Sequence, residues 1–302
     1  TIGYYVGDLN SITLNENMIL VASTTTTDKI VSRLYLNEDQ HYQGVNYSLR
    51  AANSVSSTIS GILTNNGNGF TDGDGSVAQL TNTTTNAYAI SHDDSFMIIV
   101  DSDKGIARKI NLVSGNYETT TVIGDITQGD VDQRGVVDGG LGAGKIQSVY
   151  SIDITSDNRY VLFGDGSALR QLDLNDNTIS TLNSSLAGGG STHVGISIHP
   201  NQQYVLMTEH INPRIVKVEL SGSYNSSIWF GNGANADGAS SLYYPWLIKI
   251  AGSGNYVVTG GGGAGSGLFR YFDINAQPHP ANGAWVGAGL SGSYPRHVVM
   301  SD

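Results

Sequence analysis

Two histidines stand at matching places, each at the start of a short apolar run typical of a β-strand. The runs are His193-Val194-Gly195-Ile196 and His297-Val298-Val299. Imidazole nitrogens bind zinc, and a catalytic zinc needs three protein ligands and one open position. His210 is the remaining candidate ligand, while the matching positions of the other runs hold no His, Asp or Glu. The three histidines are therefore candidate metal ligands, with ordinary polar residues facing the interior as the alternative.

Two stretches gather aspartates at a spacing that suits calcium. Asp72 and Asp74 lie in Asp72-Gly73-Asp74-Gly75, and Asp130 and Asp132 flank one valine. Neither stretch has the full EF-hand spacing with its terminal Glu. An Asp-Gly pair also suits a tight turn, because Asp accepts bonds from nearby amides and Gly accepts a positive φ. We expect turns, with calcium at these four residues as the alternative and no other cofactor.

Aromatic side chains gather in the run Tyr243-Tyr244-Pro245-Trp246, where a loop meets a predicted strand. Aromatic clusters on a protein surface bind sugars or protein partners. The alternative is packing between neighbouring sheets, which also needs large side chains. We expect packing, and Tyr243, Tyr244 and Trp246 are the candidate binding residues.

The composition excludes several classes of site. The chain has no cysteine, which excludes disulfides, thiolate metal sites and a cysteine nucleophile. Its net charge of −11 argues against nucleic acid, whose phosphates need a basic surface. No stretch of about 20 apolar residues is present, so we expect no membrane span. No Gly-x-Ser-x-Gly motif marks a nucleophilic serine.

Four Asn-x-Ser/Thr triplets are candidate N-glycosylation sites, at Asn46, Asn82, Asn183 and Asn225. Such triplets also arise by chance in a chain this rich in Asn, Ser and Thr. The chain begins at Thr1 rather than at an initiator Met, which indicates a processed or partial product. Together with the low charged fraction of 14%, these features predict an extracellular or cell-surface glycoprotein.

One sequence unit occurs five times. In each unit an apolar run precedes a second run that ends in an apolar, a polar and an apolar residue, at Leu34-Tyr35-Leu36, Ile110-Asn111-Leu112, Leu172-Asp173-Leu174, Val218-Glu219-Leu220 and Phe272-Asp273-Ile274. Turn residues divide the third unit, 148–182, into four short strands. Four antiparallel strands per repeat of about 40–50 residues are typical of a β-propeller blade.

The repeats predict an all-β fold: a six-bladed-type β-propeller that forms a single domain, 1–302. Five blades are complete, at about 9–63, 85–125, 146–183, 191–231 and 243–288. The sixth is incomplete and is expected to form from both termini, 1–7 and 294–302. An incomplete blade leaves an unpaired edge, which predicts self-association.

A second motif lies between the repeats. Gly69-Phe70-Thr71-Asp72-Gly73 precedes Leu80, Gly135-Val136-Val137-Asp138-Gly139 precedes Ile146, and a shorter version ends at Asp237-Gly238. With the strand endings, this motif resembles the NHL-repeat family of β-propellers. The fourth repeat departs from the family in having Gly188-Gly189-Gly190 instead. The family's Asp-x-x-Asn-x-Arg is not cleanly present, and its nearest form is the run from His210 to Arg214. The resemblance implies the fold, and it leaves the function open because propellers serve many roles.

We therefore expect a non-catalytic extracellular propeller that binds protein partners or builds an assembly such as a surface layer or fibre. A metal-dependent lyase or hydrolase that uses the three candidate histidines at the central channel of the propeller is one alternative. A carbohydrate-binding propeller that uses the aromatic run is the other.

Overall fold

The computed structural model describes the following residues: 9–15, 18–24, 29–35, 55–60, 71–79, 86–102, 104–113, 115–128, 132–189, 192–234, 242–261, 267–275 and 285–290. They contain β-strands and one short 3-10 helix, η1 (Ile126–Gln128). No helix in these ranges is long and apolar enough to cross a membrane.

The strands form five four-stranded sheets. Blade 1 holds β1 (Leu9–Asn15), β2 (Met18–Thr24), β3 (Lys29–Tyr35) and β4 (Val55–Ser60), and blade 2 holds β5 (Asn86–Ile90), β6 (Phe96–Asp101), β7 (Ile106–Asn111) and β8 (Thr119–Ile123). Blade 3 holds β9 (Ile152–Ile154), β10 (Tyr160–Asp165), β11 (Ala168–Asp173) and β12 (Thr178–Asn183). Blade 4 holds β13 (His193–Ile198), β14 (Tyr204–Glu209), β15 (Arg214–Glu219) and β16 (Ser226–Phe230), and blade 5 holds β17 (Pro245–Ile250), β18 (Tyr256–Gly261), β19 (Gly267–Asp273) and β20 (Trp285–Leu290).

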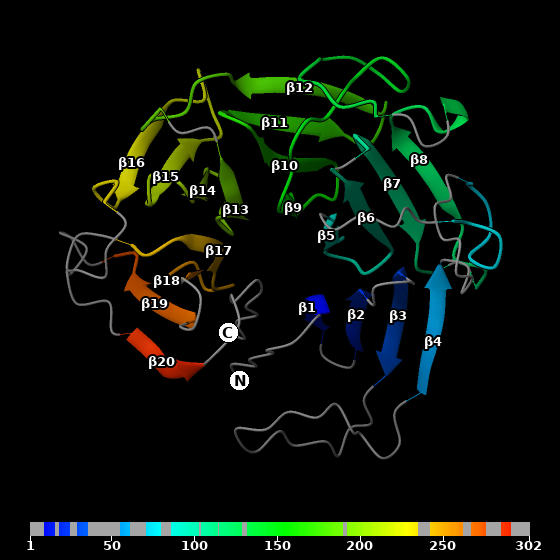
Figure 1. Ribbon diagram of the computed structural model, residues 1–302, viewed down its shortest axis with the longest axis horizontal. Helices are drawn as coiled ribbons and strands as arrows, with labels where there is room; N and C mark the ends of the chain where they lie inside the picture. The colour runs from blue at the N-terminus through cyan, green and yellow to red at the C-terminus, as the bar shows by residue number, and fades with distance from the viewer. Residues whose placement is uncertain are drawn as a thin grey trace.

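The five sheets stand around a common centre as in a β-propeller (Figure 1). Each sheet is an antiparallel meander, with its first strand nearest the centre and its fourth strand outermost. The described residues thus form five blades and not the six of the prediction. The segments expected to make the partial sixth blade, 1–7 and 294–302, lie outside the described residues.

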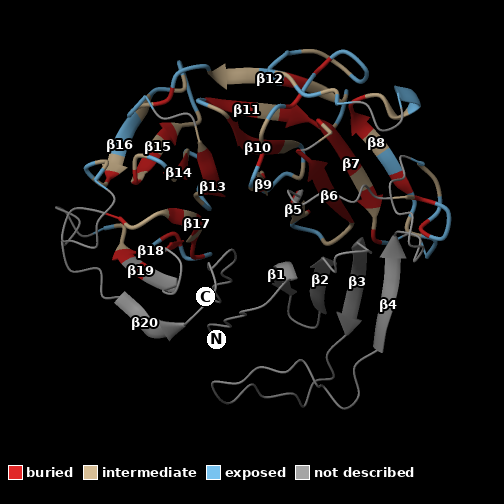
Figure 2. Ribbon diagram, viewed as in Figure 1, coloured by how far each residue is buried: buried red, intermediate tan, exposed pale blue. Residues whose placement is uncertain are grey.

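The hydrophobic core lies between neighbouring sheets. Strands β6 and β13 are buried along their whole length. Ile98 and Val100 of β6 pack against blade 3, and Ile196 and Ile198 of β13 pack in one cluster with Leu162 of blade 3. The outermost strands β12 and β16 are mostly half-buried or exposed (Figure 2). This gradient explains why the inner runs are apolar throughout while the outer runs are rich in Ser and Thr.

In blades 2 to 5 the turns after the innermost strands share one feature. Each contains a residue with positive φ, and these residues are Asp94 (59°), Asn158 (59°), Gln202 (59°) and Gly254 (73°). Asn, Asp and Gly adopt this left-handed conformation at low cost, which explains the turn residues of the repeat.

The same turns bond blade 2 to blade 3, blade 3 to blade 4 and blade 4 to blade 5. The His92 backbone amide donates to Asn158 Oδ1 at 2.6 Å, and the Ser156 amide donates to Gln202 Oε1 at 3.2 Å. The His199 ring nitrogen Nε2 lies 3.0 Å from the Gly254 carbonyl oxygen. His92 and His199 thus lie in turns and connect neighbouring blades.

Two glycines allow the inner strands to approach. A Cβ atom at Gly164 would lie 2.8 Å from the Cβ of His193 in the next blade. At Gly195 it would lie 2.7 Å from Thr208 Oγ1 and 3.0 Å from the Ile248 nitrogen. The distances of 2.8 and 2.7 Å are shorter than real Cβ contacts, so a larger residue at either position would force its neighbours to move.

We predict that Gly195→Ala lowers the free energy of unfolding by about 1–3 kcal/mol, because a methyl group overfills the contact between blades 4 and 5. Urea unfolding followed by circular dichroism measures the loss. Gly115→Ala is the matched control, since no atom lies within 4 Å of its added methyl. Equal stability of the two variants would contradict the tight approach.

Candidate functional site

The topology brings potential binding residues to one face of the ring. The start of a first strand and the end of the second strand share an edge of an antiparallel sheet, as the pairing of His193 with Glu209 shows. Strands β13 and β17 run in the same direction, because the Ile250 amide donates to Ser197 Oγ and the Ile248 nitrogen lies beside Gly195. We call the face where the first strands begin the upper face.

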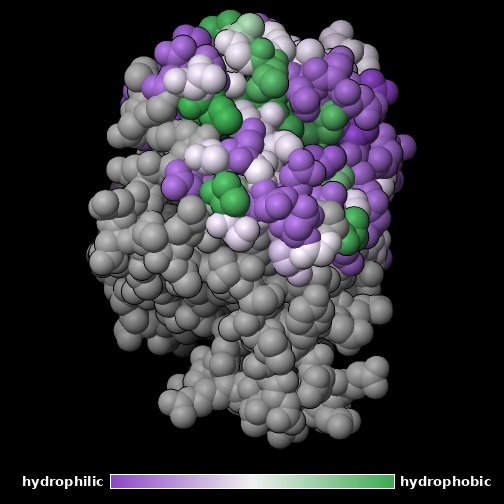
Figure 3. Space-filling model, turned by 90° about the vertical axis from the view of Figure 1, so that its right-hand side faces the viewer, coloured by the Kyte–Doolittle hydropathy of each residue, from purple (hydrophilic) through white to green (hydrophobic). Residues whose placement is uncertain are grey.

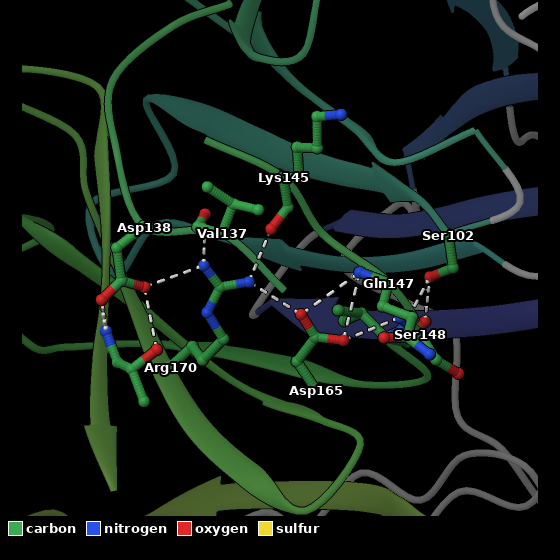
Figure 4. A network of polar contacts seen from close by, with 10 residues as sticks. Ser102, Val137, Asp138, Lys145, Gln147, Ser148, Asp165 and Arg170 are labelled. Carbon is green, nitrogen blue, oxygen red and sulfur yellow. Dashed lines mark hydrogen bonds and ion pairs between the residues drawn. The ribbon is translucent and has the colours of Figure 1, made fainter. Parts of the chain in front are cut away.

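A buried arginine dominates the upper edge of blade 3 (Figure 4). Arg170 Nη1 donates to Asp165 Oδ2 at 2.8 Å and to the Lys145 carbonyl at 2.6 Å. Its Nη2 donates to Asp138 Oδ1 at 3.0 Å and to the Val137 carbonyl at 2.7 Å. A single guanidinium therefore binds the hairpin of β10 and β11 to the segment that leads into the blade.

The two carboxylates that bind Arg170 also fix the backbone. Asp138 accepts hydrogen bonds from the amide and the hydroxyl of Thr181 on β12, at 3.0 and 2.8 Å. Asp165 accepts the amides of Gln147 and Ser148, just before β9. Burial would raise the pKa of Asp138, but the bonds from Thr181 and the charge of Arg170 outweigh it and lower that pKa. The carboxylate is thus held ionised.

Blade 2 repeats the arrangement. Asp72 Oδ1 accepts Arg108 Nη2 at 2.7 Å, and the same carboxylate accepts the amide and the hydroxyl of Thr121 at 2.8 and 3.0 Å. Arg108 also donates to the carbonyls of Thr71 and Gln79. We call each such trio, Asp72–Arg108–Thr121 and Asp138–Arg170–Thr181, an aspartate–arginine clamp.

The glycine after each clamp aspartate pairs with the outer edge of the blade. Gly73 and Thr119 exchange two backbone hydrogen bonds, of 3.0 and 2.8 Å, and so do Gly139 and Ile179. The segment between blades therefore covers the edge strand β8 or β12 before it crosses the upper face.

The aspartates considered for calcium contact protein groups. Asp72 binds Arg108 and Thr121, Asp74 accepts Asn116 Nδ2 at 2.6 Å, and Asp132 pairs with Arg134 at 2.7 Å. Asp130 lies outside the described residues. The turn interpretation explains the contacts of Asp72, while calcium stays a prediction.

Blade 4 lacks the clamp. Val216 occupies the position of Arg170, since both stand opposite the residue two before the end of the second strand. Arg214 lies at the hairpin end and donates to the Gly188 carbonyl at 2.7 Å. Glu209 is fully buried, 3.7 Å from Arg214, and accepts Asn212 Nδ2 at 2.8 Å. In the run from His210 to Arg214, the nearest form of Asp-x-x-Asn-x-Arg, Asn212 and Arg214 therefore both lie beside Glu209.

The clamp arginines were not identified from the sequence alone, although a signal exists. Asp165 and Arg170 keep the first and last residues of the Asp-x-x-Asn-x-Arg pattern, with Ala168 in place of its asparagine. Arg108 and Arg270 stand at the same register as Arg170 in their own blades. Each of the three follows an Asp-Gly pair, and blade 4, which has no Asp-Gly pair, has no arginine there. This joint occurrence within one chain was the available signal.

His193 is 3% exposed at the start of β13. Its Nδ1 lies 2.9 Å from the Gly166 carbonyl, which can only accept, so Nδ1 carries the hydrogen. The buried Nε2 has no hydrogen-bond partner among the described residues. Burial lowers the pKa of His193, although the Gly166 carbonyl and the charge of Glu209 act in the opposite direction.

His210 belongs to an aromatic cluster, which we define as Tyr150, His210, Tyr243, Tyr244 and Trp246. The His210 ring centroid lies 4.1 Å from that of Trp246 and 5.0 Å from that of Tyr244. Tyr150 meets the edge of Trp246 at 6.3 Å. Tyr150 is exposed and the other rings are half-buried, so the cluster joins blades 3, 4 and 5 and still presents ring surface.

The candidate metal ligands contact different blades. His193 bonds to the Gly166 carbonyl of blade 3, and His210 stacks on Trp246 of blade 5. Among the described residues, no group of three or more His, Asp or Glu side chains could hold a metal ion. His297 lies outside those residues, so the three-histidine site stays a prediction.

Two glycosylation candidates can be placed. The Asn183 side chain is engaged at both ends, because its Nδ2 donates to the Tyr224 carbonyl and its Oδ1 accepts the Ser185 amide. Asn225 is exposed and directly precedes β16. Asn46 and Asn82 lie outside the described residues.

Apolar residues do not gather on the side of the ring seen in Figure 3. The hydrophobic groups there are separate and stand among hydrophilic ones. The described part of that side thus offers no broad apolar surface.

Comparison with known proteins shows the fold. No protein-family model matches the chain, and no curated protein sequence matches it. The chain is similar in structure to an auxiliary nutrient binding protein from Bacteroides thetaiotaomicron, with a TM-score of 0.52, 11% identity and coverage of 91% of this chain and 59% of that one. A putative 6-phosphogluconolactonase from Bacteroides uniformis has a TM-score of 0.51 and 10% identity, with coverage of 95% of this chain and 72% of that one. A functionally unknown protein from Desulfotomaculum acetoxidans has a TM-score of 0.51 and 14% identity, with coverage of 98% of this chain and 74% of that one. These likenesses support a β-propeller and no particular function.

We predict that Asp165→Asn lowers the free energy of unfolding by about 3–5 kcal/mol, because it removes a charge partner from a fully buried guanidinium. Chemical denaturation measures the change. Asp132→Asn is the matched control, since its pair with Arg134 is exposed and its loss should change stability little. Equal effects would show that the buried ion pair does not hold blade 3.

We predict that stability falls as the pH drops below about 6.5, the ordinary pKa of histidine. The pKa of His193 is lower in the folded protein than in the unfolded chain, so the unfolded chain binds the proton first as the pH falls. Protonation therefore stabilises the unfolded state relative to the folded state. His210 acts in the same direction, because burial lowers its pKa too. The denaturation midpoint should therefore fall between pH 7.5 and pH 5.5. The fall should be smaller in His193→Gln, and an unchanged fall would contradict this origin.

Proposed function

We propose that this protein is a non-catalytic, extracellular β-propeller that serves as a protein-interaction or structural module and is distantly related to NHL-repeat proteins. The observation that carries the proposal is that three carboxylates of the upper face are occupied by contacts within the protein. Asp72, Asp138 and Asp165 each bind an arginine together with backbone amides. Carboxylates in such contacts connect strands and segments, whereas a general acid or base must be open to a substrate.

The surface composition supports the same proposal. The outer strands present Ser and Thr, and the charged fraction of the chain is only 14%. A repeated scaffold with few charged residues suits contacts with other macromolecules, because propellers bind partners through loops held on a fixed ring.

Sedimentation velocity over a wide range of protein concentration tests the proposal. We expect either concentration-dependent association or co-sedimentation with a macromolecule from the same extracellular medium. A strict monomer that binds no macromolecule would count against it.

Carbohydrate binding is a second candidate, and the aromatic cluster favours it. Its rings lie close together on the upper face and keep part of their surface exposed. Flat aromatic surfaces of this kind contact the apolar faces of sugar rings.

We predict that Trp246→Ala weakens the binding of a saccharide found on a glycan array by at least about tenfold, as expected for the loss of a central aromatic contact. Trp229→Ala is the matched control, because that half-buried indole contacts Phe272 in another place. Equal binding by the wild type and Trp246→Ala, or an array with no ligand, would remove this candidate.

A further inference from the structure

The outer edges of blades 2 and 3 are covered by the chain itself. The amide and carbonyl of Thr119 on β8 both bond to Gly73, and those of Ile179 on β12 both bond to Gly139. The next outward amide on each strand, that of Thr121 or Thr181, donates to the clamp aspartate. Three outward backbone groups are therefore satisfied on each edge.

The strand pairing identifies the equivalent groups in blade 4. Ile228 stands opposite Val216, as Thr181 stands opposite Arg170. Ser226, two residues before Ile228, thus corresponds to Ile179 of β12. The Asn225 carbonyl accepts the Glu219 amide, so Ser226 and Ile228 direct their backbone groups away from β15.

These outward groups have no backbone partner in blade 4. No hydrogen bond of the described residues involves the amide or carbonyl of Ser226 on this side, or the amide of Ile228. Among the described residues of the segment before blade 4, the hydrogen bond to β16 is the one from the Ala187 amide to the Ser226 hydroxyl, at 2.9 Å. The Ile228 side chain is 47% exposed, and most of β16 is exposed or half-buried in Figure 2.

The sequence of β16 does nothing to prevent pairing. Ser226–Phe230 contains no charged residue and no proline, which are the usual devices that protect an edge strand. An unpaired, uncharged edge is a template for a further strand.

We propose that β16 pairs antiparallel with β16 of a second copy of this chain, around a two-fold axis at Ser227. Ser226 then exchanges both backbone hydrogen bonds with Ile228 of the partner subunit, and the two blades form one continuous sheet. This inference rests on the proposed function, because it names a surface through which the module assembles.

Self-complementarity and charge favour a second copy as the occupant. The outward groups at Ser226 and Ile228 lie symmetrically about Ser227, which is the pattern of an isologous contact. Copies with a net charge of −11 repel each other, and this repulsion is weakest at an uncharged edge. Val216 and Ile228 replace the Arg and Thr of the clamp, so the edge accepts an apolar side chain rather than an aspartate.

A site-specific disulfide tests this geometry, because the chain contains no cysteine. In the proposed pair the two Ser227 residues face each other as a non-hydrogen-bonded pair, with Cα atoms about 4.5 Å apart. That distance suits a disulfide. Ser227→Cys should give a cross-linked dimer under mild oxidation. The protein is made in a bacterial host without N-glycosylation, because a glycan on Asn225 would stand beside this edge.

Thr120→Cys is the matched control. Thr120 is exposed on β8 opposite Lys109, as Ser227 is on β16 opposite Lys217, but Gly73 covers that edge. It should give no dimer above the background of random collision. Equal cross-linking of the two variants would overturn the proposal.

Sedimentation equilibrium of the cysteine-free chain gives an independent readout. Ile228→Lys should weaken dimer formation at least about tenfold, since it places like charges at the two-fold contact. Val113→Lys, at a valine that is 72% exposed elsewhere, should leave it unchanged.

The outcomes separate this inference from the proposed function. A dimer that is insensitive to Ile228→Lys and forms no disulfide at Ser227 overturns the β16 contact and leaves an assembling module intact. A monomer whose Ser226 and Ile228 amides resist hydrogen exchange at high dilution shows that another segment of the same chain covers the edge, which also overturns it.

Discussion

The buried guanidinium of Arg170 is the interaction on which the geometry of blade 3 depends. It is fully buried, and it binds two carboxylates and two backbone carbonyls. A buried charge is tolerated only when its donors are well matched, so the segment from Val137 to Lys145 must follow one path across the upper face. The clamp therefore positions connections that have little apolar content of their own.

In blades 2 and 3 the same short sequence, an Asp-Gly pair, forms the clamp and covers the outer edge of the sheet. The aspartate binds arginine and threonine, and the glycine after it pairs with the outer strand, as Asp72-Gly73 and Asp138-Gly139 do. Blade 4 has neither the Asp-Gly pair nor the arginine, and its edge strand keeps unbonded backbone groups among the described residues. The loss of one motif thus changes a blade from a self-covered sheet to one that can accept a strand.

The same contacts limit what the upper face can do chemically. The clamp carboxylates are occupied by arginine and amides, and His193 is buried in its neutral form against the Gly166 carbonyl. The aromatic cluster, in contrast, keeps ring surface exposed where three blades meet. Internal ion pairs therefore hold the described part of this face together.

The sequence by itself determined the repeat, its four-stranded antiparallel units and the turns that separate them, because alternation, apolar runs and Asn/Asp/Gly turns are local signals. Its five complete blades correspond to the five described sheets, its partial sixth blade lies outside the described residues, and it did not reveal the partners of Arg108 and Arg170. Only the tertiary structure decided those, since the clamp joins residues far apart in the chain at a register that the hairpin lengths fix. The loop from His210 to Pro213 shows this, because two more loop residues than in blade 3 place Arg214 at the hairpin end and leave Val216 in the clamp position.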